Sequence, residues 1–248
     1  MSLSQGGNAI VVGTQTAASL GSQPRIRLLE WLRNQTDRPR FAVVHAFSTH
    51  NLLLRYWLAS GGADPDRDIE TVVIPPEQVV ESLAAGSITA FCAGAPWGDV
   101  AERQGAGRIL LGTSAIWPFH PEKCLCVGET WAEANPDLLH HLLRAVLRAQ
   151  ILCDRPEEAP CIAALLADPG GLCLPEDACR AALPGGTGAE LIRFYSREAW
   201  FPARAHALWF LGQMQRWGWL DETTDLGAVA AQVYRPDLLA NAVEAEGL

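Results

Sequence analysis

The amino-acid sequence predicts an α/β protein with a mostly parallel sheet and helices on its faces. Through the first half of the chain, short buried runs alternate with helical patterns in the order strand–helix–strand–helix–strand–helix–strand. The connections between them are short, as in α/β proteins whose parallel strands are joined by crossover helices. The second half is instead dominated by helical patterns.

The elements of the first half follow from apolar periodicity and turn residues. Residues 9–12 form a short apolar run, and a helical pattern covers 24–32. The predicted strands are residues 41–45, 71–74, 88–92 and 108–111. A helix over 51–58 has Ser48 or Thr49 as its N-cap. Another helix, with an apolar face at 79–83, follows a Pro-Pro pair.

The second half has weaker strand signals. Residues 124–127 are one more candidate strand, and an Asn-Pro pair at 135–136 opens a long amphipathic helix that reaches Ile151. Residues 155–190 are rich in Pro, Gly and Ala, which predicts short helices and loops, and 203–219 is a further helix. The last third is therefore expected to be helical, with no sheet of its own.

Composition excludes several classes of function. With 19 basic and 28 acidic residues the formal net charge is −9, which argues against direct nucleic-acid binding. No apolar run approaches the roughly 20 residues of a membrane span. Lys123 is the one lysine among the 19 basic residues. Position alone leaves two interpretations of Lys123 open, a surface residue or a functional one.

Cysteine usage and the first residues predict a cytoplasmic location. None of the seven cysteines forms a C-x-x-C pair, and their spacing fits no zinc template, so no metal site is expected. Buried, reduced thiols are the ordinary interpretation, which favours a reducing compartment. Residues 1–7 have neither a basic nor an apolar signal-peptide region.

Two loops lie where ligands bind in α/β sheets, beyond the carboxyl ends of strands. One covers residues 45–51 and leads into a helix N-terminus, whose free N–H groups attract anions. The other covers residues 94–98. Both are candidate parts of a binding site.

Several short motifs, in one order, resemble a known family. They are Gly7–Ile10, Ser48–Asn51 followed by Leu54–Leu58, Asp64–Asp68, Pro75–Val79, Phe91–Trp97 and Ile116–Lys123. Together they resemble the nitrate- and bicarbonate-binding proteins of ABC transporters and the related cytoplasmic nitrate sensors that act in antitermination. The resemblance implies a periplasmic-binding-protein-like fold of type II, in which a small anion lies between two α/β lobes.

This resemblance also implies a division of the chain. Residues 8–118 correspond to one complete α/β lobe, the second of the fold, and 119–248 to the helical C-terminal part of the first lobe. The main strands of that first lobe, the N-terminal one, are absent, so we expect a truncated binder with weak binding or none. Its unpartnered helices are expected to expose an apolar face that a second copy of the chain covers.

The expected ligand is a small inorganic anion such as nitrate, nitrite or bicarbonate, with no cofactor. The resemblance places Lys123 against the anion and implies that the loop before the Thr49-His50 dipeptide, with Phe47 and Ser48, also contributes. The predicted ligand-binding residues are Phe47, Ser48, Thr49, His50, Gly94, Trp97 and Lys123. Expected partners are the membrane subunits of an ABC transporter or an antiterminator protein. A periplasmic location is the alternative if a signal peptide was lost with the first lobe.

An enzyme of the same fold is the competing hypothesis, although no enzymatic activity is predicted. Pyrimidine-synthesis and desulfination enzymes share this fold and use Cys or His near the cleft. In this sequence the corresponding candidates are Cys92 and His45. An exposed, low-pKa Cys92 within reach of a histidine would favour this alternative.

Overall fold

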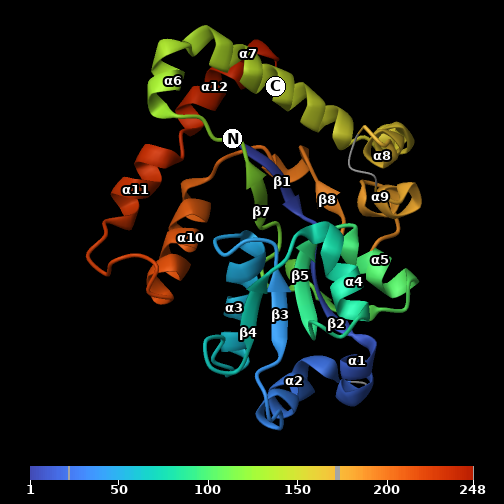
Figure 1. Cartoon of the computed structure of the whole chain (residues 1–248). Helices are drawn as coiled ribbons and strands as arrows, with labels where there is room; N and C mark the ends of the chain where they lie inside the picture. The colour runs from blue at the N-terminus through green and yellow to red at the C-terminus, as the bar shows by residue number, and fades with distance from the viewer. Residues whose placement is uncertain (22, 171–173, 248) are drawn as a thin grey trace.

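The computed structural model describes residues 1–21, 23–170 and 174–247 (Figure 1). Its strands are β1 (Ser2–Gly6), β2 (Asn8–Gly13), β3 (Arg40–Val43), β4 (Glu70–Val73), β5 (Ala90–Gly94), β6 (Gly107–Gly112), β7 (Pro121–Cys124) and β8 (Ile192–Arg193). They form a five-stranded sheet in the order β4-β3-β5-β2-β6 and a three-stranded sheet in the order β7-β1-β8. The predicted α/β class is confirmed.

Four of the five strands in the larger sheet run in one direction. β3 is parallel to both β4 and β5, whereas β2 is antiparallel to β5 and to β6. The four strands predicted from the sequence are therefore mutually parallel, with bounds shifted by one or two residues. The apolar run at 9–12 is the central, reversed strand β2, so the sheet is mixed.

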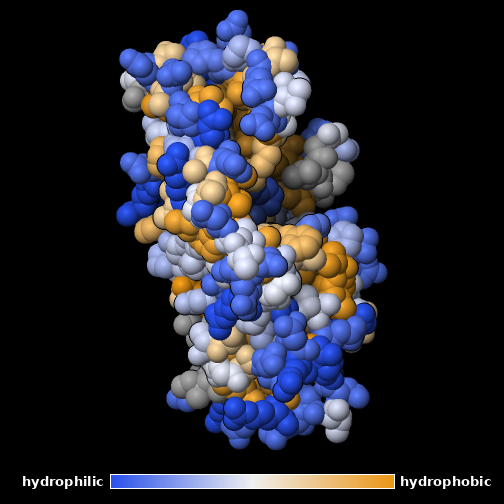
Figure 2. Space-filling model, turned by 90° about the vertical axis from the view of Figure 1, so that its left-hand side faces the viewer, coloured by the Kyte–Doolittle hydropathy of each residue, from blue (hydrophilic) through white to orange (hydrophobic). Residues whose placement is uncertain are grey.

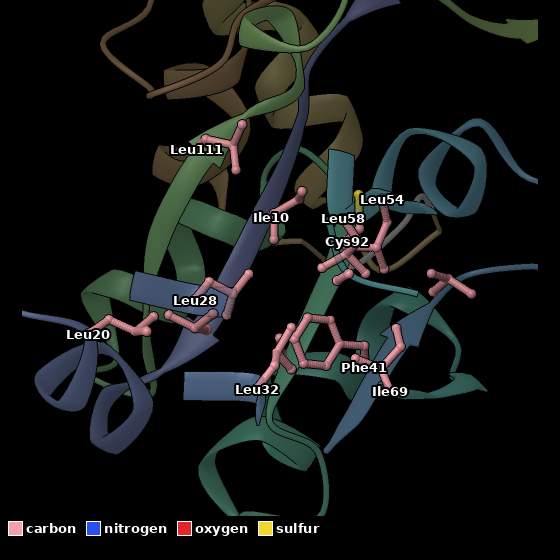
Figure 3. Close-up of a cluster of buried hydrophobic side chains, with 14 of the residues drawn as sticks. Ile10, Leu20, Leu28, Leu32, Phe41, Leu54, Leu58, Ile69, Cys92 and Leu111 are labelled. Carbon is pink, nitrogen blue, oxygen red and sulfur yellow. The ribbon is translucent and has the colours of Figure 1, made fainter. Parts of the chain in front are cut away.

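Helices cover both faces of this sheet. On one face pack α1 (Thr14–Leu20), α2 (Pro24–Arg33) and α3 (Thr49–Ser60), and on the other α4 (Val79–Ala84) and α5 (Trp97–Arg103). Alternation along β2 explains the two cores, because Ile10 and Val12 face the first set of helices while Ala9 and Val11 face the second. Figure 3 shows the first core, with Phe41 lying beside Leu32 and Ile69.

Helix α3 begins where the sequence predicted. Ser48 is its N-cap, and the Ser48 side chain accepts a hydrogen bond from the Asn51 backbone N–H at 3.2 Å. Thr49 is the first helical residue. The N-cap position holds the start of the helix at the carboxyl end of β3, next to the loop after that strand.

The remaining helices lie in the second half of the chain. They are α6 (Glu129–Ala134), α7 (Pro136–Cys153), α8 (Ala159–Ala167), α9 (Glu176–Ala182), α10 (Arg204–Arg216), α11 (Leu226–Val233) and α12 (Pro236–Ala245). Short 3₁₀ turns cover Pro76–Gln78, Thr113–Ala115, Pro156–Glu158 and Ser196–Glu198. The predicted long helix is α7, which buries Leu139, Leu143 and Leu147.

Two expectations for the second half are wrong. The strand expected at 124–127 lies instead at Pro121–Cys124, where β7 pairs with β1 through Ser2 and Cys124. The last third also supplies a strand, β8, which pairs with the other edge of β1. Both strands owe their pairing to β1, from the start of the chain, and neither has a strong local apolar pattern.

Helix α7 is fastened to the small sheet by one buried side chain. Gln150 donates its amide to three carbonyl oxygens, those of Ser2, Leu3 and Phe194, at 2.8–3.1 Å. In Figure 1, α7 crosses above this sheet, with α12 beside it. Gln150 thus fixes the distance between the helix and both β1 and the segment after β8.

The cysteines are less buried than expected. Only Cys92 and Cys179 are buried among those the structure describes, whereas Cys124, Cys126 and Cys161 are exposed. Cys153 is half-buried, and Cys173 lies outside the described residues. The two cysteines of the C-x-C motif flank Leu125, whose side chain packs among the helices and leaves the thiols outside.

Several large apolar side chains of the helices reach the surface. They are Leu138, Leu152, Leu165, Leu208 and Val233, exposed by 43–67%. On the face that carries α10 and α11, Figure 2 shows apolar residues in separate places among hydrophilic ones. Self-association through such a face stays a prediction. Within the described residues, no helix has the length and apolar character needed to cross a membrane.

Candidate functional site

A pocket of about 380 Å³ lies between the two sheets, beneath α7. Its walls come from β1 and the Gly6-Gly7 turn, from β7, from the end of β5, from the segment around β8 and from the inner face of α7. The lining residues with polar side chains are Ser4, Asn8, Glu122, Lys123 and Gln150. The pocket therefore lies at the carboxyl end of β5, where ligand sites of α/β sheets are expected.

Four polar residues form what we call the Glu122 cluster: Asn8, Glu122 and Lys123, which line the pocket, and His50, which is not a lining residue and lies against Glu122. Asn8 donates its amide to Glu122 Oε2 at 2.8 Å, and the Lys123 ammonium donates to Glu122 Oε1 at 3.2 Å. His50 Nε2 lies 4.0 Å from the same Oε1. One carboxylate thus connects β2, β7 and the first turn of α3.

His50 carries unused hydrogen-bonding capacity in this cluster. Its side chain is 4% exposed, and neither ring nitrogen has a hydrogen-bond partner within the described structure. Asn8 Oδ1 is likewise buried and unpaired. Because unpaired buried polar groups cost free energy, such atoms mark a place where a polar ligand or water is accommodated.

Burial sets the charge of the cluster. It lowers the pKa of His50 to about 4, against the opposing pull of Glu122, so the imidazole is neutral at pH 7. Burial alone would raise the pKa of Glu122. Three neighbours outweigh this effect of burial: the charge of a protonated His50, the charge of Lys123 and the hydrogen bond from the Asn8 amide. Together they hold the pKa of Glu122 below its usual value. At neutral pH the cluster therefore contains one positive and one negative charge.

A second set of hydrogen bonds supports Asn8 from behind. The Thr113 hydroxyl donates to the Asn8 carbonyl oxygen at 3.0 Å, and His120 Nε2 lies 2.7 Å from the same hydroxyl. Since Thr113 has one hydroxyl proton, we assign the donor proton of the second bond to His120 Nε2. Burial lowers the pKa of His120, which keeps this ring neutral as well.

Lys123 has an unusual backbone. Its φ is 57°, in the left-handed region that residues with a side chain rarely adopt. The conformation lies inside β7, between Glu122, which points into the cluster, and Cys124, which is exposed. The Lys123 side chain is 67% exposed, so its ammonium sits at the pocket rim.

The structure brings some of the predicted ligand-binding residues together and separates others. Lys123 and Gly94 line the pocket, and a Cβ on Gly94 would lie 3.7 Å from His50 Nε2. The Ser48 hydroxyl accepts the hydrogen bond that caps α3 and donates one to the His45 carbonyl oxygen. Thr49 is not among the lining residues.

Phe47 and Trp97 lie away from the pocket lining. Phe47 is 59% exposed and contacts the edge of Trp219, and Trp97 packs partly buried against the second core. Asn8 and Glu122 were not among the residues predicted for the site. Both lie inside motifs that carry the family resemblance, the segments Gly7–Ile10 and Ile116–Lys123, which is the signal that could have found them.

Cys92, the nucleophile that the enzyme hypothesis requires, is not placed to react. Cys92 is fully buried in β5, and burial raises the pKa of its thiol, so it is neither exposed nor a thiolate at neutral pH. His45 is exposed, and its Nδ1 accepts a hydrogen bond from the Phe47 backbone N–H at 3.1 Å. Among the described residues, no group of three or more His, Cys, Asp or Glu side chains is arranged to hold a metal ion.

The helix-covered sheet, the small second sheet and the pocket between them define a protein of the type II periplasmic-binding-protein class. The structure of the periplasmic nitrate-binding protein NrtA from Synechocystis superimposes with a TM-score of 0.89 at 30% identity, covering 98% of this chain and 66% of that one. The sulfonate-binding protein SsuA from Methylobacillus flagellatus shares the fold, with a TM-score of 0.61 at 17% identity.

The chain belongs to the NMT1-like family, whose model matches residues 1–167. Among curated relatives, the nitrate/nitrite binding protein NrtA of Synechococcus elongatus is 37% identical, over 83% of this chain and 49% of that protein. The nitrate import ATP-binding protein NrtC of Synechocystis is 35% identical, over 98% of this chain and 38% of that protein. The chain thus spans about half the length, or less, of these curated relatives.

Proposed function

We propose that the protein binds a small inorganic anion of the nitrate type and serves as the solute-binding component of an ABC import system. The observation that carries this proposal is the position of the Lys123 ammonium at the pocket rim, beside a buried His50 whose ring nitrogens are unpaired. Nitrate accepts hydrogen bonds but donates none, so an ammonium and an imidazole N–H suit it. Relatives named as nitrate/nitrite binding proteins support the choice of anion.

Replacing Lys123 by Ala should abolish stabilisation by nitrate. At a nitrate concentration 100 times Kd, the wild-type protein should gain about 2.7 kcal/mol of unfolding free energy, seen as a rise in melting temperature. The variant loses the charge that attracts the anion and should show no rise. Lys123→Arg keeps a cation at the rim and should retain part of the shift.

Chloride at equal ionic strength controls for general salt effects. An unchanged nitrate shift in Lys123→Ala would contradict the assignment of this residue. Absence of any shift in the wild type with millimolar nitrate, nitrite or bicarbonate would contradict the proposed function itself.

Anion binding should strengthen as the pH falls. The charges of Lys123 and Glu122 cancel in the free cluster, so a bound anion leaves a net negative charge near His50. That charge raises the pKa of His50 from about 4 and makes binding take up a proton, with His120 and Lys123 as the other titratable neighbours. Calorimetry between pH 8 and pH 5 should show a falling Kd, and His50→Gln should flatten the dependence.

The partner is the second part of the proposal. Relatives of this chain include components named as ATP-binding proteins for nitrate import and bicarbonate transport, which supports a role beside ABC transporter subunits. Affinity purification from cell extract, with and without nitrate, tests it. Recovery of transporter subunits supports the proposal, whereas recovery of an RNA-binding antiterminator would replace the transporter by a nitrate sensor.

A further inference from the structure

Two cysteines lie side by side at the end of β7. The sulfur atoms of Cys124 and Cys126 are 3.3 Å apart, and both side chains are exposed. Leu125 between them packs with Leu139 and Leu143, and its backbone N–H donates to the Met1 carbonyl oxygen at 3.0 Å. Leu125 is anchored inward, and the sulfur atoms on either side of it lie together on the outside.

We propose that Cys124 and Cys126 form a reversible disulfide with each other, a redox modification site that a small-molecule disulfide such as oxidised glutathione produces. The sulfur atoms need to approach from 3.3 Å to the bond length of about 2.0 Å. Extended chain separates the Cα atoms of such a pair by about 6.6 Å, near the upper end of the range that disulfides span. Formation of the disulfide therefore requires a small backbone movement.

The two sulfur atoms differ in their surroundings, and this difference determines which of them attacks first. Burial raises the pKa of Cys124 to about 11, and the hydrogen bond to Cys126 and the charge of Cys126 add to the effect. A raised pKa lowers the fraction of Cys124 that is thiolate, so we assign the first attack to the sulfur of Cys126, which lies 3.3 Å away. The thiolate is the attacking form in thiol–disulfide exchange.

The reaction balances in two steps. Cys126 Sγ attacks one sulfur of oxidised glutathione, the glutathione S–S bond breaks, and one glutathione leaves as a thiolate. Cys124 then gives its proton to solvent, and its sulfur attacks Cys126 Sγ, which releases the second glutathione. Two protein thiols are oxidised to one disulfide, and one glutathione disulfide is reduced to two thiols.

No other cysteine in the described ranges is placed like this pair. Cys92 and Cys179 are buried and Cys153 is half-buried, whereas Cys161 is exposed on α8. Cys161 is therefore an internal reference for simple accessibility. The dithiol is separate from the anion proposal, because neither sulfur is part of the Glu122 cluster.

The test is peptide mass spectrometry of the full-length chain after incubation with oxidised glutathione and alkylation of the remaining thiols. The wild-type peptide that contains both cysteines should lose two hydrogen atoms and carry no glutathione, and dithiothreitol should reverse this. Cys124→Ser should trap glutathione on Cys126, and it should do so faster than Cys126→Ser traps it on Cys124. Cys161→Ser should leave the internal disulfide unchanged.

Two results would overturn the proposal. One is a wild-type peptide that carries glutathione on Cys124 or Cys126 without an internal disulfide. The other is a peptide with both thiols unmodified under conditions in which Cys161 has reacted.

Discussion

Phe41→Ala is expected to lower the free energy of unfolding by about 3–5 kcal/mol, the largest single effect that we predict. Phe41 is fully buried at the centre of β3, in the core between the sheet and helices α1–α3. Truncation removes apolar contacts and leaves a cavity, because the parallel neighbours β4 and β5 hold the strand on both sides. Urea unfolding followed by circular dichroism measures the loss.

Phe47→Ala is the matched control for this variant. Phe47 is 59% exposed and its ring contacts only the rings of Trp219 and His45 among the described aromatic pairs, so its loss should cost less than about 1 kcal/mol. Equal losses for the two variants would contradict the core that the structure shows.

Acid is expected to weaken the fold through His50. Its pKa is lowered from 6.5 in the unfolded chain to about 4 in the folded one, so folding favours the neutral ring. The resulting stability is fully present above pH 6.5 and is lost as the pH falls toward 4. At 1.36 kcal/mol per pKa unit, the loss amounts to about 3 kcal/mol. Unfolding curves at pH 7.5, 6, 5 and 4 measure it.

His50→Gln separates this effect from other titrations. Burial also lowers the pKa of His120, and Glu122 has a lowered pKa, so both act in the same direction as the pH falls. The glutamine variant should show a shallower pH slope, whatever its stability at pH 7.5. His141→Gln, at an exposed position of α7, should keep the wild-type slope. Identical slopes for all three proteins would mean that His50 is solvated in the folded state.

The sequence predicted the elements whose signal is local. The helix α7 follows from leucines at helical spacing, and the cap of α3 follows from a serine directly before an apolar helical pattern. The strands β3 to β6 follow from short buried runs. The reversed direction of β2 could not be predicted, because the apolar run at 9–12 has the same pattern whichever way it enters the sheet.

The site was predicted only in part, for a related reason. The sequence pointed to Lys123, His50 and the Gly94 loop, which the structure places in or beside the Glu122 cluster, but Glu122 and Asn8 are joined by a hydrogen bond between residues 114 positions apart. Nothing in the local sequence shows that Glu122 turns inward while its neighbour turns outward. The alternation depends on β7 pairing with β1, and β7 has little apolar pattern of its own.

The pairing of β1 also determines when the pocket can exist. β1 contacts residues 121–124 on one side and 192–193 on the other, whereas all five strands of the larger sheet lie within residues 8–112. Contacts between distant residues form late, because a long loop must first close. During synthesis, all strands of the five-stranded sheet are available for pairing before β8, the second partner of β1, has been synthesised. The scaffold is thus assembled early, and the pocket wall around β8 is added after it.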